Sequence, residues 1–118
     1  MAEQSESWPS EWDALAAAPE HHRLLLENES VRVLETRIEP GETTPLHTHC
    51  WPAVYTVYSW SHFIRRNEMG EVTLDTREAK MSGTPGQAIW APPIPMHSLE
   101  NVGEQAIYLI SVEIKQTY

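Results

Sequence analysis

The sequence predicts an all-β domain with one short helix near its N-terminus. Three observations support this fold class. Apolar and polar residues alternate with a period of two over much of the chain. Short apolar runs recur at intervals of about ten residues. Nine prolines and five glycines fall mostly between these runs, where they mark turns. About eight short strands separated by turns indicate a sandwich or a barrel.

A short helix is expected over residues 10–18. Ser10 is suited to cap its N-terminus, acidic residues occupy its first turn, and Pro19 ends it. Trp12, Leu15 and Ala16 form its apolar stripe. A stripe this narrow predicts a helix that lies on the surface of a larger unit.

The strand patterns follow the helix in chain order. In residues 31–38, Val31 and Val33 alternate with Arg32 and Leu34, which favours a strand over a helix. Residues 54–60 are rich in aromatic and β-branched side chains and predict a central strand. Residues 67–70 predict a hairpin loop. In order, strands are expected at 24–26, 31–38, 54–60, 62–66, 71–77, 87–91 and 106–114.

Length, charge and cysteine count limit the function. A chain of 118 residues predicts one domain, with an acidic segment at 1–21 and the β domain at 22–118. The net charge of −9 argues against nucleic acid or an anionic membrane as a partner. The single cysteine excludes an internal disulfide. No signal peptide or long apolar span is visible, so the cytoplasm is the expected compartment.

Two histidines lie two positions apart, at His47 and His49. On a strand, residues i and i+2 point to the same face, so the two imidazoles would share one side. Neutral imidazole binds zinc, iron, nickel and copper. A solvated pair on an exposed strand is the alternative interpretation of this short motif.

The spacing around this pair and around His97 resembles the two motifs of the cupin family. The spaced residues are Gly41, His47 and His49 in the first half and Gly86, Pro92, His97 and Asn101 in the second. The resemblance covers residues 22–115 and implies a small jelly-roll β-barrel of the RmlC-like type. It also implies one divalent metal ion inside the barrel, held by His47, His49 and His97, and a homodimer.

The sequence departs from the family pattern at one metal ligand. The first cupin motif carries a glutamate where this chain has Ala53 or Val54. Three histidines without a carboxylate leave the charge of a bound ion uncompensated and open positions for water, dioxygen or an anionic substrate. Iron, zinc, nickel and manganese all stay candidates, with iron favoured for an oxygenase because the thiol dioxygenases use a similar three-histidine centre. A cupin that has lost its metal is the alternative.

Few other side chains offer chemistry near this site. His62 and Tyr55 are the candidate catalytic residues, although a surface or strand-pair histidine is the favoured interpretation of His62. Arg65 and Arg66 alternate on one strand, so at most one of them faces inward, where it would suit a carboxylate. The predicted function is that of a metal-binding cupin, of oxygenase type, acting on a small and anionic organic metabolite. A non-catalytic small-molecule-binding cupin, or an isomerase or lyase, is the alternative.

Overall fold

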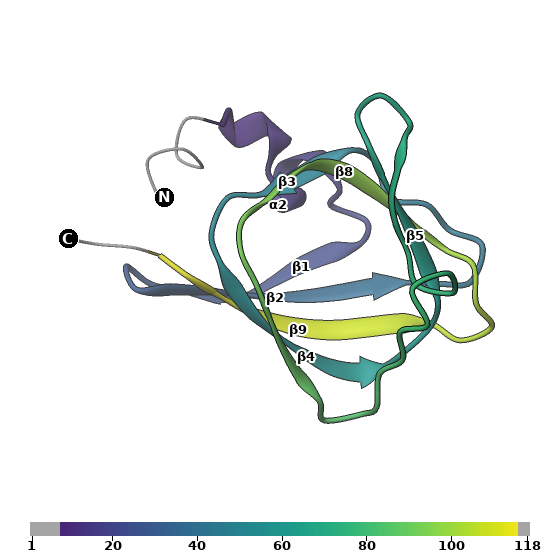
Figure 1. The fold of residues 1–118 in the computed structure, drawn as a ribbon. Helices are drawn as coiled ribbons and strands as arrows, with labels where there is room; N and C mark the ends of the chain where they lie inside the picture. Colours follow the sequence, from purple (N-terminus) through teal and green to yellow (C-terminus); the bar gives the residue numbers. More distant parts are fainter. Residues whose placement is uncertain (1–7, 116–118) are drawn as a thin grey trace.

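The computed structural model describes residues 8–115. Within this range, nine strands form two antiparallel sheets that enclose an interior (Figure 1). The strands are β1 (His22–Glu27), β2 (Val31–Ile38), β3 (His47–His49), β4 (Ala53–Ser59), β5 (Phe63–Asn67), β6 (Val72–Asp75), β7 (Ala88–Ala91), β8 (Ile94–Asn101) and β9 (Ile107–Ile114). The five-stranded sheet has the order β1-β2-β9-β4-β7, and the four-stranded sheet has the order β3-β8-β5-β6. This architecture confirms the predicted all-β class.

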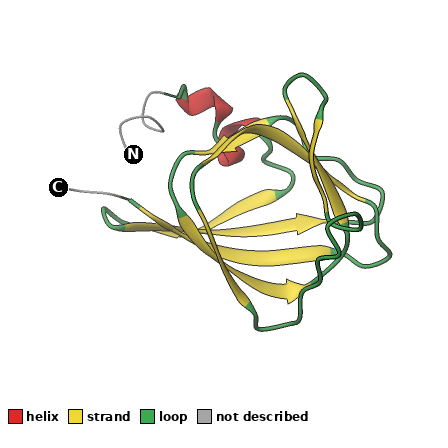
Figure 2. Ribbon diagram, viewed as in Figure 1, coloured by secondary structure: helices red, strands yellow, loops and turns green. Residues whose placement is uncertain are grey.

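Alternation along β2 shows how the sequence builds the interior. Arg32, Leu34, Thr36 and Ile38 are buried, whereas the residues between them are half-buried or exposed. Strand β9 lies between β2 and β4, in the middle of the five-stranded sheet. Strands account for nearly all regular structure, and loops join them around the rim (Figure 2).

The expected helix over residues 10–18 is divided in two. A 3₁₀ turn, η1 (Ser10–Trp12), precedes a four-residue helix, α2 (Ala14–Ala17). Asp13 separates them, because its backbone is extended and its carboxylate accepts a hydrogen bond from the Leu15 N–H. Asp13 therefore caps α2, and the prediction of Ser10 as the cap of one continuous helix is wrong.

The expected apolar stripe of this segment is also wrong. Ala14 and Ala18 are fully buried, whereas Trp12 and Ala16 are exposed. Small side chains let the helix approach the barrel, where α2 packs on β1 and β3. Among the described residues, no helix is long and apolar enough to cross a membrane.

Both histidine motifs lie on strands that pair with each other. His47 on β3 lies opposite His97 on β8, and the register shifts before His49 pairs with Ile94. Pro95 lies in this irregular stretch, where its missing N–H costs no regular ladder hydrogen bond. The pairing brings residues 50 positions apart in sequence to the same end of the barrel.

Candidate metal centre

An internal cavity of about 170 Å³ lies between the two sheets. Most of its wall is apolar, with Val57, Phe63 and Leu109 among the lining residues. Four histidines line it as well: His22, His47, His49 and His97. The barrel interior therefore combines an apolar pocket with a cluster of metal-ligating side chains, which is the usual composition of a small-molecule site.

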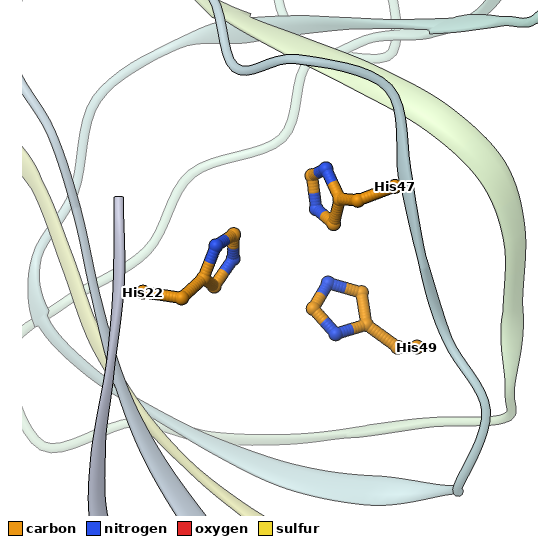
Figure 3. Close-up of side chains that lie close together, drawn as sticks. All are labelled: His22, His47 and His49. Atoms are coloured by element: carbon orange, nitrogen blue, oxygen red, sulfur yellow. The ribbon is translucent and has the colours of Figure 1, made fainter. Parts of the chain in front are cut away.

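Three of these histidines converge on one point (Figure 3). His22 comes from β1, and His47 and His49 come from β3. One ring nitrogen from each lies within 4.8 Å of the others, and all three residues are buried. His97 completes the cluster from β8, with its ring centroid 4.4 Å from that of His47 and 5.4 Å from that of His49.

The cluster differs from the set predicted from sequence. His47, His49 and His97 do lie together, but His22 was missed and belongs to the tightest group. One signal for it was available. His22 and Leu24 lie two residues apart at the beginning of the first strand, and extending the expected strand at 24–26 by two residues would have placed His22 on it.

Backbone carbonyls fix the tautomer of three of the histidines. Nδ1 of His22 lies 3.0 Å from the carbonyl oxygen of Ala18. Nδ1 of His47 and Nδ1 of His97 each lie 2.8 Å from the carbonyl of the proline two residues earlier. A carbonyl only accepts, so each Nδ1 carries the proton and donates, which leaves the lone pair of Nε2 available to a metal ion.

Glu113 supplies the matching partner for His49. This glutamate is fully buried on β9, and its Oε2 lies 3.6 Å from Nδ1 of His49. Both atoms lack a hydrogen-bond partner in the described structure. In metalloproteins a carboxylate commonly accepts the Nδ1–H of a ligating histidine. The two orphaned atoms therefore fit a metal ion bound at the other nitrogen of His49.

Glu113 also stands close to where the sequence lacks the cupin glutamate. In the β4–β9 ladder Glu113 lies directly opposite Ala53. Its Oε1 accepts a 2.6 Å hydrogen bond from Nε of Arg32, whose other nitrogens form a bidentate pair with Asp13. A carboxylate is thus present behind His49, where it shares Arg32 with Asp13, although it does not belong to the histidine group itself.

Burial keeps the cluster uncharged at neutral pH. Desolvation, with the mutual repulsion of the imidazoles, lowers the pKa of His22 to about 4. The same causes lower the pKa of His47, His49 and His97 to about 3. Neutral imidazoles are the form that binds metal, so the donor set is prepared at physiological pH.

Acid is expected to destabilise the metal-free protein. Unfolded histidine titrates near its ordinary pKa of 6.5, well above the values of about 3 to 4 in the folded cluster. Below pH 6.5 the unfolded chain therefore binds protons that the folded chain does not, so stability is present above this pH and falls as the pH drops toward 4. Burial raises the pKa of Glu113, and this carboxyl therefore has the opposite effect on stability. It is one group, whereas four histidines lower the stability in acid.

Urea unfolding of metal-free protein at pH 7 and pH 5 measures this effect. The urea midpoint should be lower at pH 5. An unchanged or higher midpoint would contradict the assignment of four buried neutral histidines.

The other residues proposed from the sequence differ in whether they line the cavity. Tyr55 lines the cavity, with its ring centroid 6.3 Å from that of His49. His62 does not line the cavity, and its Nδ1 lies 2.9 Å from the Thr76 hydroxyl instead. His62 therefore lies beside Thr76 and apart from the cavity wall, and its catalytic role stays a prediction. Of the two arginines of which at most one was expected to face inward, Arg65 lines the cavity and Arg66 pairs with Glu100 outside it.

Solved structures resemble this fold. A cupin domain from Bordetella pertussis Tohama I matches with a TM-score of 0.64 and 24% identity, over 80% of this chain and 92% of that one. An RmlC-like cupin family protein with a double-stranded β-helix fold from Methanocaldococcus jannaschii has a TM-score of 0.56 and 14% identity, over 79% and 77%. The polyketide cyclase RemF from Streptomyces resistomycificus has a TM-score of 0.53 and 21% identity, over 85% and 68%.

No protein-family model and no curated protein matches the sequence. The fold evidence therefore comes from the structure, and it agrees with the resemblance carried by the two histidine motifs. These observations together show that the chain is a small cupin in fold, with the jelly-roll barrel known as a double-stranded β-helix.

Proposed function

We propose that this cupin is a metal-dependent enzyme of oxygenase type that acts on a small organic molecule. His22, His47, His49 and His97 would hold one divalent transition metal ion, with iron favoured for an oxygenase. The observation that supports the proposal most strongly is the cluster of four buried, neutral imidazoles. Three of them donate their Nδ1–H to a backbone carbonyl. A bound ion would supply Lewis-acid chemistry and, as iron, the ability to bind dioxygen.

The protein's own residues would position the substrate and exclude water. The apolar wall of the cavity, which includes Ile38, Val57 and Leu109, would take up the hydrocarbon part of the substrate. Tyr55 faces the same space, and burial raises the pKa of its phenol, so the hydroxyl stays protonated and available as a hydrogen-bond donor. Glu113 and Arg32 would hold His49 in place from behind.

A second reaction class has one observation in its favour. RemF, a structural neighbour with 21% identity, is a polyketide cyclase. Cupin folds thus support reactions other than oxygenation, and a cyclase, isomerase or lyase would use the same cavity. A non-catalytic small-molecule-binding protein is the third alternative, and it needs no turnover.

The expected homodimer also stays a prediction. The exposed Leu24, Leu25 and Leu26 of edge strand β1 are the surface we would assign to it.

Oxygen consumption separates these functions. Iron-loaded protein should consume dioxygen when supplied with a panel of small carboxylates, thiols and phenols, and zinc-loaded protein should not. The His49→Ala variant, loaded in the same way, controls for free iron. Conversion of a panel compound without oxygen uptake would favour the isomerase or lyase class, and binding without conversion would favour the non-catalytic protein.

A further inference from the structure

We infer that the cavity binds a small monocarboxylate, with the carboxylate paired to Arg65 and the apolar part filling the remaining space. The role of this molecule as a substrate rests on the proposed function. Its binding does not, because Arg65 is not one of the four histidines assigned to the metal ion.

Strand register places Arg65 inside the barrel. Arg65 lies on β5, opposite Leu99 of β8 and Leu74 of β6, and all three residues line the cavity. On β8, His97 lies two residues before Leu99, on the same face of the sheet. Diagonal neighbours in a ladder lie within reach of a long side chain. A carboxylate on Arg65 would therefore hold the rest of the molecule near the histidine cluster.

Arg65 has no protein partner in the described part of the chain. The side chain is half-buried, its Nε is fully buried without a hydrogen-bond acceptor, and no ion pair found among residues 8–115 includes it. Each of the other five arginines pairs with a carboxylate: Arg23, Arg32, Arg37, Arg66 and Arg77. A guanidinium withdrawn from part of its water without a charged partner is costly to a fold. The exception among the described arginines thus points to a bound ligand, and an anion matches the charge of the guanidinium.

The rest of the cavity supports an anionic ligand. Among the described residues, no aspartate or glutamate lines it. Arg65 is the one side chain with a permanent charge among the described residues of the wall. Tyr55 lines the same space, and its hydroxyl is a hydrogen-bond donor for the same anion. Although the chain has a net charge of −9, the wall of this cavity therefore carries a positive charge.

Size and shape define the ligand further. A cavity of about 170 Å³ is similar to the roughly 150 Å³ apolar cavity that admits benzene, and smaller than the pockets of drug-sized ligands. Trp60 and Phe63 on the wall suit a single ring or a short chain. The planar guanidinium matches a carboxylate with two parallel hydrogen bonds. One cation in an apolar wall suits a monoanion better than a phosphate, which would leave further charge without a partner.

Benzoate is the probe for this site, and benzamide is its neutral counterpart of the same shape. Calorimetry on chelator-treated protein should show benzoate binding about tenfold or more tightly than benzamide, as expected for a hydrogen-bonded charge. Arg65→Met should reduce benzoate affinity by about the same factor and leave benzamide unchanged. Arg66→Met is the matched control, because Arg66 follows on the same strand and pairs with Glu100 outside the cavity.

Stability gives a second measurement that does not depend on a ligand. Arg65→Met removes a half-buried charge that has no charged partner among the described residues, so it should raise the Tm. A purely structural role for Arg65 would lower the Tm instead and would overturn the inference. Equal benzoate affinity in Arg65→Met and the parent chain would also overturn it.

Metal loading separates this inference from the proposed function. Benzoate that binds only metal-loaded protein, with no dependence on Arg65, would assign the carboxylate to the metal and overturn the inference. Displacement of benzoate by inorganic phosphate at equal concentration would overturn the choice of a monocarboxylate. Arg65-dependent binding of benzoate in a protein that takes up no metal would support the carboxylate site. The same result would contradict the metal centre and leave this inference standing.

Discussion

Replacing His22 with alanine should remove most of the metal from the protein. His22 is one of three buried histidines whose ring nitrogens converge within 4.8 Å, and its Nδ1 is held by the Ala18 carbonyl. Loss of one of these ligands should weaken metal binding by more than the roughly 10–100-fold expected when a residue behind a ligand is changed. Metal content after dialysis, measured by elemental analysis, gives the result.

His21→Ala is the matched control for this variant. His21 is adjacent in sequence, but its Nδ1 contacts the Arg37 carbonyl away from the cluster, so metal content should stay at the level of the parent chain. Glu113→Gln tests the residue behind His49 and should weaken metal affinity by about 10–100-fold. Full metal retention in His22→Ala would show that His22 is not a ligand.

Arg32→Met should lower the free energy of unfolding by about 3–5 kcal/mol, the usual loss when one partner of a buried ion pair is removed. Arg32 is buried and bonds Glu113 at 2.6 Å and Asp13 at 2.8 and 2.9 Å. Burial would raise the pKa of Asp13, but the Arg32 guanidinium brings it below its ordinary value, so this carboxylate depends on its partner. Urea unfolding at pH 7 measures the loss.

Two further variants make this test specific. Arg32→Lys keeps the charge but lacks the planar fork, so its loss of stability should be intermediate. Arg23→Met removes an exposed ion pair with Glu35 and should leave the urea midpoint unchanged. A loss in Arg32→Met no larger than that in Arg23→Met would contradict the role of this network in holding the N-terminal segment and Glu113 together.

The sequence was sufficient for the fold because the relevant signals are local. Alternation in residues 31–38 matches the buried and exposed sides of β2. The spacing of His47, His49 and His97 identified three residues of the cluster, although the strands that carry them, β3 and β8, were not among the expected strands. The helix prediction failed because Asp13 is held by Arg32, a tertiary contact that overrides local propensity.

The site residues that the sequence did not reveal owe their positions to the register of strand pairing. His22 belongs to the cluster because β1 pairs with β2, placing His22 opposite Thr36 on the cavity wall. Glu113 lies opposite Ala53 only in the folded ladder, since the two are far apart in sequence. For Arg65 and Arg66, a shift of one residue would exchange the inward and outward side chains, so composition alone could not assign them.

Metal content of the chain purified without chelator tests the central claim most directly. Four buried neutral imidazoles with free Nε2 atoms predict about one transition metal ion per chain, removed by the His22→Ala change and retained in His21→Ala. A folded protein that contains no metal, and takes up none when incubated with iron, zinc, nickel or manganese salts, would contradict the metal centre.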